Sequence, residues 1–185
     1  MKVEATKLKD CFIIHDTIFA DDRGYFFESF NQQKFHALTG ISTHFVQDNQ
    51  SKSTRGVLRG LHFQQGEHAQ AKLVRVLEGK VLDVAVDIRK ESPTFGEYVA
   101  VELTADNHVQ LFVPRGFAHG FVVLSDVATF FYKCDNFYNK ASEGGLIYND
   151  STINIDWRIN SSEVLLSEKD AALPTLVESK DRIYF

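Results

Sequence analysis

The stretch Val57-Leu58-Arg59-Gly60-Leu61-His62-Phe63-Gln64, with Lys72-Leu73-Val74-Arg75-Val76 just downstream, decides how the rest of the chain is interpreted. Both runs are rich in the apolar and β-branched residues of strands, and a polar loop over residues 65–70 separates them. They carry an arginine, a histidine and a lysine on two neighbouring strands. Cations that close on adjacent strands suit an anionic ligand, and a neutral histidine among them can serve as a base. A lone histidine is also an ordinary core residue, so the rest of the chain must decide between the two interpretations.

Length and composition predict one globular domain covering residues 1–185, which is long enough for a real core. The hydrophobic content of 44% and the charged content of 24% are ordinary, and 16 Phe beside 3 Pro fit a β-rich interior. The net charge of −5 argues against nonspecific nucleic-acid binding. Arg59, Lys72 and Arg75 would therefore form a local basic patch on an acidic protein.

Cysteine usage and hydropathy predict a cytoplasmic protein. Cys11 and Cys134 lie far apart, without the spacing of a metal site, and two reduced buried thiols are expected rather than a disulfide. The N-terminus has no apolar signal-type region, and no run approaches the ~20 apolar residues of a membrane helix. We expect neither a membrane nor a nucleic acid as partner.

Short β-type runs recur along the chain with few helices between them, which predicts an all-β antiparallel sandwich or barrel. A β-prone run over residues 25–30 and a strand over 44–50 are expected, followed by three hairpins that pair 72–77 with 80–88, 98–103 with 108–113, and 121–124 with 128–133. A helix is expected over residues 31–38, with Asn31 as N-cap and Gly40 as its stop. A second helical turn is expected around Ser167 to Ala171, with Ser167 as cap.

The run Pro114-Arg115-Gly116-Phe117-Ala118-His119-Gly120 lies between two expected strands, and its Pro-x-Gly-x-x-His spacing resembles the second motif of cupin jelly rolls. A metal-binding cupin would carry His-x-His and a downstream Glu in its first motif, whereas this chain reads His62-Phe63-Gln64. His68 lies beyond a glycine-containing loop and is a poor replacement, while Gln64 and Glu67 stay open as donors. Because the donors of such sites must converge, a metal-free cupin is expected.

Phe130, Tyr132 and Cys134 share one face of an expected strand. Tyr132 by itself would be a core residue whose hydroxyl finds a backbone acceptor. If this face lines the same cavity as His62, the two side chains can remove a proton from one face of a substrate carbon and return one to the other. Such an epimerisation needs a carbonyl beside the carbon and a cation for the enolate oxygen, for which Lys72 is the candidate. Periodicity does not say which of the 25 acidic residues would orient the histidine.

A resemblance adds what periodicity cannot. Over about residues 8–175, in order and at family-like spacing, the chain resembles the dTDP-4-dehydrorhamnose 3,5-epimerase family. The runs that carry the resemblance are residues 22–29, 45–49, 57–64, 72–75, 83–89, 114–120 and 169–170. The family's fold implies an antiparallel, cupin-like jelly roll with a few short helices.

By this resemblance, His62 would be the base, Asp170 its partner, Lys72 the cation for the enolate oxygen, and Tyr132 the proton donor on the opposite face. The resemblance also implies a set of substrate contacts, of which Arg23, Arg59 and His119 would meet the diphosphate or sugar and two aromatic residues would flank the thymidine. The aromatic pair is Phe26 and Tyr138, and the remaining contacts are Glu28, Gln47, Asp48, Asn49, Glu143 and Lys169.

The reaction implied is inversion of C3 and C5 of a dTDP-4-keto-6-deoxyhexose, without metal or nicotinamide, for surface-polysaccharide synthesis. The resemblance further implies a homodimer whose N-terminal segments complete the partner's sheet and nucleotide site. Alternatives remain open: a C3 mono-epimerase, a 3,4-ketoisomerase, a metal-dependent cupin oxygenase, or a non-catalytic sugar-nucleotide-binding cupin. Gln64 in place of a histidine disfavours the oxygenase.

Arg59 and His62 pose one geometric difficulty. They are three positions apart, so an ideal strand would point them to opposite faces. Either Gly60 marks a bulge that re-aims one of the two side chains, or Arg59 reaches the ligand over the edge of the sheet.

Overall fold

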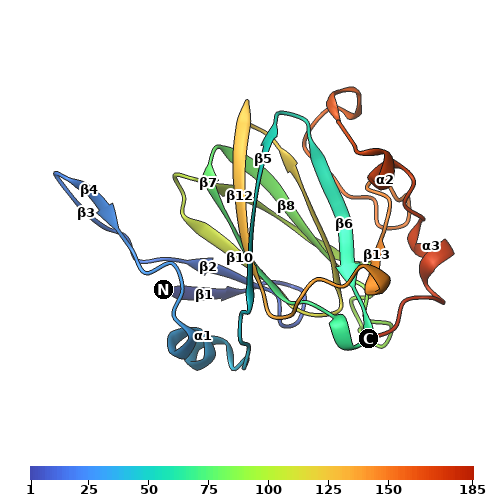
Figure 1. Cartoon of the computed structure of the whole chain (residues 1–185), viewed down its shortest axis with the longest axis horizontal. Coiled ribbons are helices and arrows are strands. Elements are labelled where there is room, and N and C mark those ends of the chain that lie inside the picture. Colours follow the sequence, from blue (N-terminus) through green and yellow to red (C-terminus); the bar gives the residue numbers. More distant parts are fainter.

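Two antiparallel sheets pack face to face in the structure, a computed structural model that describes all 185 residues (Figure 1). The six-stranded sheet has the order β1 (Lys2–Ala5), β2 (Phe12–His15), β10 (Val109–Val113), β7 (Lys72–Glu78), β12 (Val127–Cys134) and β5 (Gln47–Thr54). The five-stranded sheet has the order β13 (Glu143–Gly145), β6 (Leu58–Gln64), β11 (Phe117–Val123), β8 (Lys80–Asp87) and β9 (Tyr98–Thr104). The expectation of an all-β, antiparallel, cupin-like jelly roll is confirmed.

The three expected hairpins are wrong, although their strands exist. β7 pairs with β10 and β12, whereas β8, which follows it in the chain, pairs with β9 and β11 in the other sheet. In the same way β9 and β10 belong to different sheets, and so do β11 and β12. Gly79, at φ 77°, turns the chain between β7 and β8, and a side chain there would overlap the carbonyl of Val127. A tight turn of this kind serves a corner between sheets as well as a hairpin, so turn chemistry alone does not distinguish them.

The five-stranded sheet is buried on both faces. Val81 and Ala85 of β8 belong to the apolar cluster between the two sheets. Leu82, Val84 and Val86 of the same strand belong to a second cluster, which the C-terminal third of the chain covers. This explains the nearly continuous apolar sequence of β8, since a strand covered on both sides has no solvated face. A third cluster, around Phe35 and Phe112, seats helix α1 (Gln32–Thr39).

Both expected helices are confirmed, including their caps. The Asn31 side chain accepts from the backbone N–H of Lys34, and Gly40 ends α1 in the left-handed region at φ 72°. Ser167 caps α2 (Glu168–Ala171) by accepting from the backbone N–H of Asp170. The remaining helical turns are α3 (Leu176–Ser179) and three 3₁₀ turns, η1 (Gly66–His68), η2 (Lys140–Ser142) and η3 (Ser161–Glu163). None of the helices has the length and apolar character needed to cross a membrane.

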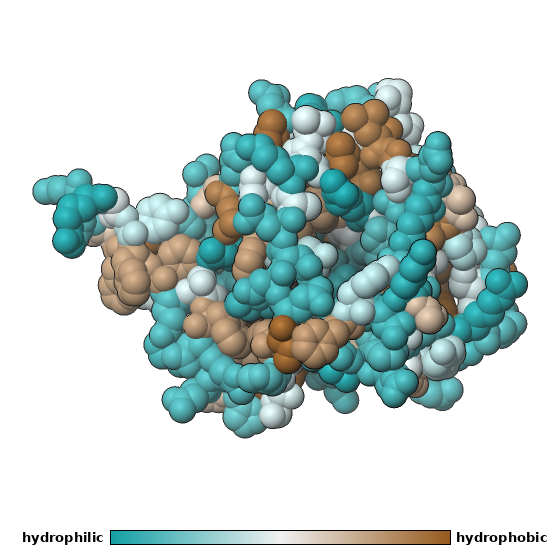
Figure 2. Space-filling model, in the orientation of Figure 1, coloured by the Kyte–Doolittle hydropathy of each residue, from teal (hydrophilic) through white to brown (hydrophobic).

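A hairpin arm of β3 (Phe19–Asp21) and β4 (Gly24–Phe26) projects from the body of the molecule (Figure 1). The expected β run over residues 25–30 therefore ends early, at Phe26. No other strand pairs with the arm, and Phe19, Tyr25 and Phe26 remain more than half exposed on it. Figure 2 shows hydrophilic residues at the tip of the arm and hydrophobic ones nearer the body. Large exposed apolar side chains on a projecting element are typical of interaction surfaces.

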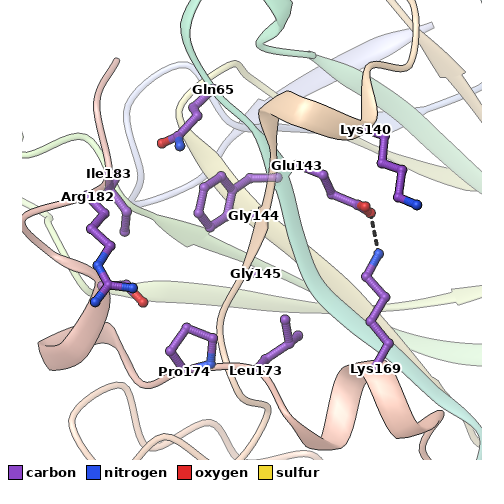
Figure 3. Close-up of a pocket in the computed structure, with 12 residues that line it drawn as sticks. Gln65, Lys140, Glu143, Gly144, Gly145, Lys169, Leu173, Pro174, Arg182 and Ile183 are labelled. Atoms are coloured by element: carbon purple, nitrogen blue, oxygen red, sulfur yellow. Dashed lines mark ion pairs between the residues drawn. The ribbon is translucent and has the colours of Figure 1, made fainter.

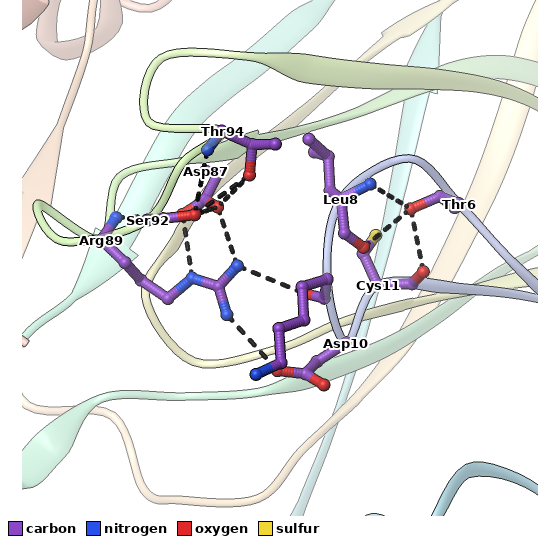
Figure 4. A network of polar contacts seen from close by, with 9 residues as sticks. Thr6, Leu8, Asp10, Cys11, Asp87, Arg89, Ser92 and Thr94 are labelled. Atoms are coloured by element: carbon purple, nitrogen blue, oxygen red, sulfur yellow. Dashed lines mark hydrogen bonds and ion pairs between the residues drawn. The ribbon is translucent and has the colours of Figure 1, made fainter.

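A buried carboxylate ties the N-terminal segment to the end of β8 (Figure 4). Asp87 has no exposed surface, and it accepts hydrogen bonds from Arg89 (2.7 and 2.9 Å), Ser92 (2.6 Å) and Thr94 (2.7 Å). Arg89 in turn donates to the carbonyl of Lys9 at 3.2 Å. Burial raises the pKa of Asp87, but these hydrogen bonds outweigh it and lower the pKa overall.

The two thiols are free and buried, as expected. Burial raises the pKa of Cys11, which lies beside this network, to about 12, and that of Cys134 to about 11. Neither thiol is therefore a ready nucleophile.

Replacing Asp87 by alanine should lower the free energy of unfolding by about 3 kcal/mol, because it leaves Arg89 and two hydroxyls without their acceptor. Since the folded state lowers the pKa of Asp87, its contribution is present above about pH 4 and is lost as the pH falls through the lowered pKa. Urea unfolding at pH 7 and at acid pH measures both effects. Glu91→Ala, an exposed carboxylate nearby without a hydrogen bond, is the control; equal losses in the two variants would contradict the prediction.

Candidate active site

A cavity of about 400 Å³ opens between the two sheets. β6 and β11 of one sheet, β5, β7 and β12 of the other, and α2 supply its walls. The lining residues are Asn49, Gln50, Ser51, Arg59, His62, Lys72, His119, Phe121, Phe130, Tyr132, Ser167, Lys169 and Asp170. All four residues expected to perform chemistry, His62, Lys72, Tyr132 and Asp170, are among them.

His62 on β6 is held by a carboxylate from a distant part of the chain. Its Nε2 lies 2.6 Å from Oδ1 of Asp170, whose side chain is 6% exposed. Burial lowers the pKa of His62, and the opposing effect of Asp170 does not fully cancel this. The imidazole is therefore neutral at pH 7, and the carboxylate favours the tautomer with the proton on Nε2. Nδ1 is then left with a lone pair that can accept a proton.

Lys72 and Tyr132 face the cavity from the opposite sheet. The Lys72 Nζ lies 5.8 Å from the centre of the Tyr132 ring and has no hydrogen-bond or ion-pair partner in the chain. Burial lowers the pKa of Lys72, and burial raises the pKa of the Tyr132 hydroxyl, which has no hydrogen-bond partner either. An unpaired, largely buried ammonium is costly, and an anionic oxygen placed beside it would remove that cost.

A register shift brings Arg59 and His62 into the same cavity. His62 pairs with His119 of β11, but Arg59 pairs with Phe121, so three steps along β6 match two along β11. Of the two alternatives, the bulge at Gly60 is therefore the one present. Gly60 and Gly120 let the two backbones approach, since a Cβ on Gly60 would lie 2.6 Å from the Cα of Gly120. The Arg59 Nε donates to Ser53 Oγ at 3.1 Å, which directs the guanidinium along the cavity wall.

A second histidine–carboxylate pair, which the sequence does not predict, holds His119 at the cavity wall. Nε2 of His119 lies 3.0 and 3.1 Å from the two carboxylate oxygens of Asp83, and both side chains are buried. Asp83 is an acid inside the apolar strand β8, and a buried carboxylate needs a partner. That signal was present in the sequence, but nothing local identifies His119 as the partner.

Gln64 stabilises a loop instead of facing a metal. Its Nε2 donates to the carbonyls of His68 (2.7 Å) and Phe137 (3.2 Å), while its Oε1 accepts from the backbone N–H of Asn139. His68 bonds the Asn139 side chain at 3.0 Å, and Glu67 is exposed. No three His, Cys, Asp or Glu side chains converge as metal ligands.

Three further expected contacts, Gln47, Tyr138 and Glu143, do not line this cavity but are linked by hydrogen bonds and an ion pair to Asn49 and Lys169, which do. Gln47 donates to Asn49 within β5 at 3.1 Å and accepts from the backbone N–H of Tyr138. The Tyr138 hydroxyl donates to Glu143 at 3.1 Å, and Glu143 pairs with Lys169 at 2.7 Å (Figure 3). Burial raises the pKa of Glu143, but the ion pair outweighs it and lowers the pKa overall; the same pair raises the pKa of Lys169.

The other four expected contacts that do not line this cavity have no side-chain hydrogen bond or ion pair to a residue that does. Asp48 alternates with Gln47 and Asn49 along β5, and its carboxylate pairs with Lys133 at 3.0 Å on the outer side of the sheet. Arg23 lies on the projecting arm, where it pairs with Asp21, and Phe26 is exposed there. Glu28 follows the arm and pairs with Lys34 of α1 at 2.7 Å. Within one chain, therefore, the site lacks the contacts expected from the N-terminal segment.

Fold and cavity together define a cupin-like epimerase, in which a paired histidine faces a tyrosine and a lysine across a jelly roll. The family model of dTDP-4-dehydrorhamnose 3,5-epimerase matches residues 5–178. The chain belongs to this family. The enzyme of that name from Salmonella typhimurium is 56% identical over 176 residues, which are 95% of this chain and 96% of the relative.

Solved structures agree with this assignment. The dTDP-4-dehydrorhamnose 3,5-epimerase of Elizabethkingia anophelis superposes with a TM-score of 0.94 at 59% identity, covering 97% of this chain and 98% of its own. The dTDP-6-deoxy-D-glucose-3,5-epimerase of Legionella pneumophila, in complex with dTDP-4-keto-L-rhamnose, gives 0.91 at 48% identity, covering 95% and 93%.

Replacing Asp170 by asparagine should lower the pKa of His62 further, because the carboxylate is the main group that opposes the effect of burial. An NMR titration of the His62 imidazole in both proteins measures the difference. Asp48→Asn removes a carboxylate from the outer side of β5 and should leave the His62 titration unchanged. An Asp170→Asn protein whose His62 titrates like the wild type would show that the pair does not act on the imidazole.

Proposed function

We propose that the cavity epimerises dTDP-4-dehydro-6-deoxy-D-glucose at C3 and C5 to give dTDP-4-dehydro-L-rhamnose, for deoxysugar synthesis in the cytoplasm. The whole chain would act as one catalytic domain. The observation that carries the proposal is the position of the paired His62 on one sheet, opposite the unpaired Lys72 and Tyr132 on the other.

The first step is removal of a proton from the carbon beside the 4-keto group. Nδ1 of His62 accepts this proton, and the electron pair of the C–H bond moves into the carbonyl to give an enolate. Asp170 stabilises the imidazolium that forms, as a buried carboxylate does for a catalytic histidine. Lys72 meets the enolate oxygen, and a preorganised donor of this kind contributes roughly 3–4 kcal/mol to the transition state.

The second step returns a proton to the opposite face of the same carbon. Tyr132 donates it from its hydroxyl, the enolate collapses to the ketone, and the configuration inverts. Solvent then restores the proton on Tyr132 and removes the one on His62. Burial raises the pKa of Tyr132, which keeps the hydroxyl protonated until the carbanion needs it. Repeating both steps at the second carbon completes the double epimerisation.

Arg59 and Lys169 supply positive charge for the diphosphate and sugar of this substrate, and the His119 imidazole adds a further contact. Asn49 and Gln47 add amide groups along β5, and Tyr138 with Glu143 flanks the mouth where the thymidine would lie. Asp83 holds the His119 ring in place.

A homodimer would complete the site. Arg23 and Phe26 lie on an arm that leaves its own body, and the arm exposes three aromatic side chains. We assign these residues, with Glu28, to the nucleotide site of a second copy of the chain, where the arm would also cover its exposed aromatic surface. Asp48, on the outer side of β5, is assigned to the same contact between copies.

Incubation with the 4-keto sugar nucleotide in D2O should place deuterium at both C3 and C5. His62→Ala should reduce exchange at both carbons by about 10²–10⁴-fold while dTDP binding survives, because general-base catalysis contributes a factor of that order. Tyr132→Phe should retain part of the exchange but lose inversion, since removal and return of the proton are separate tasks. NMR of the recovered sugar measures all three results.

His44→Ala, which removes an exposed histidine bonded only to Gln32, is the matched control and should exchange like the wild type. Label at C3 alone would make the protein a mono-epimerase. Exchange that persists in His62→Ala would assign the base elsewhere. A complete absence of label would favour a sugar-nucleotide-binding protein.

Mixing two inactive variants tests the dimer. Co-expression of His62→Ala with the Arg23→Ala/Phe26→Ala double variant should restore about a quarter of wild-type activity, because half of the randomly paired dimers contain one site with neither defect. The control is His62→Ala with Lys72→Ala: both changes lie in the body, so each hybrid dimer has a defect in both sites. If the arm serves its own subunit, the first mixture remains inactive, and native mass spectrometry reports the dimer itself.

A further inference from the structure

A second pocket, of about 400 Å³, lies between β13, α2 and the C-terminal tail (Figure 3). Phe63, Leu173, Pro174 and Ile183 form its apolar lining. Arg182 stands at one end, and Lys140 with the Glu143–Lys169 pair stands at the other. A volume of this size suits a small organic ligand.

The charge of the pocket favours an anion. Lys140, Lys169 and Arg182 line it beside a single carboxylate, Glu143, in a chain whose net charge is −5. Only Lys169 has an ion-pair partner, while the Lys140 ammonium and the Arg182 guanidinium have neither an ion pair nor a side-chain hydrogen bond. The charges of Lys140 and Arg182 are therefore not used within the chain.

Buried hydrogen-bond donors in the same pocket also lack partners. Ser179 is 6% exposed, and its hydroxyl oxygen is buried without a hydrogen-bond partner. Leu146 and Leu61 exchange both backbone hydrogen bonds, so the alternation of an antiparallel pair turns the N–H of Gly145 away from β6, toward the open edge of the sheet. No backbone acceptor meets it there. Unsatisfied buried polar groups are few in native proteins, and a ligand is one explanation for them.

We propose that this pocket binds a small organic anion, with its carboxylate or phosphate against Arg182 and Ser179 and its apolar body over Phe63 and Leu173. The pocket is distinct from the catalytic cavity, with Lys169 as the only residue that lines both. Glu143 and Lys169 of this pocket are also proposed substrate contacts, but the anion is placed against Arg182 and Ser179, so the inference does not depend on the proposed reaction.

Phenyl phosphate and benzoate, titrated separately, are the probes, and ¹⁵N-labelled protein reports where each one binds. At least one probe should shift the amides of Gly144, Gly145 and Arg182 saturably, and the stronger probe distinguishes a phosphate ligand from a carboxylate. Phenol lacks the anionic group, and inorganic phosphate lacks the apolar ring. Each should therefore bind at least tenfold more weakly than the better probe. Each titration is carried out without dTDP and again with saturating dTDP, which occupies the proposed nucleotide site.

Arg182→Ala should weaken binding by about tenfold or more, as loss of a charge-assisted hydrogen bond does, and Arg182→Lys should recover part of it. Lys180→Ala removes a cation two residues away that does not line the pocket, and it should bind like the wild type. The same spectra verify that each variant is folded.

Three outcomes overturn the proposal: shifts absent for both probes, shifts unaltered by Arg182→Ala, or shifts at Gly144 and Gly145 that disappear when dTDP is added. The last would make the pocket part of the nucleotide site. Failure of the double-epimerase assignment in D2O would leave these spectra unchanged, so the two conclusions fail separately.

Discussion

Burial of both faces of the five-stranded sheet is the constraint on which the rest of the structure depends. The inner face of β8 packs against the other sheet, and its outer face, with Leu82 and Val84, must be covered by something else. The C-terminal third provides this cover through Trp157 and Leu176. Because α2 belongs to the same covering segment, the packing that shields the sheet also brings Asp170 to within 2.6 Å of His62. The same packing thus forms this core and positions the candidate catalytic pair.

The interior of the jelly roll holds several charged or titratable groups, and they differ in how their burial is compensated. His62 and His119 each have a carboxylate from another strand or helix, which fixes the ring and its tautomer. Lys72 has none, and burial lowers its pKa. An enolate oxygen would supply the missing partner only while it exists, so the interaction would be stronger in the transition state than in the ground state. The ammonium of Lys72, which has no ion-pair partner, is therefore suited to stabilising an enolate. A lysine already paired with a carboxylate would not be.

The N-terminal arm differs from the body because most of its aromatic surface is exposed. Phe19 and Phe26 are mostly exposed, while Tyr25 lies against the body with its ring 4.8 Å from that of His108. Two-stranded hairpins without further packing are marginal in water. At its base, Phe27 packs between His108 and the Arg75 guanidinium, so the arm is anchored although its tip is free. Anchoring at the base thus fixes where the arm leaves the body, while Phe19 and Phe26 stay available to another surface.

The sequence by itself determined the features that depend on a few consecutive residues: the Asn31 and Ser167 caps, the strand positions, the shared inner face of Phe130 and Tyr132, and the family. Caps, alternation and turns act within a few residues, so they can be predicted locally. Only the tertiary structure decided that consecutive strands cross between sheets, that Asp83 holds His119, that the bulge at Gly60 places Arg59 beside His62, and that Asp48 faces outward. Each of these features depends on which distant strand lies alongside. Strand pairing and burial are decided by the free energies of contacts between segments far apart in the chain, and a local sequence pattern does not contain that information.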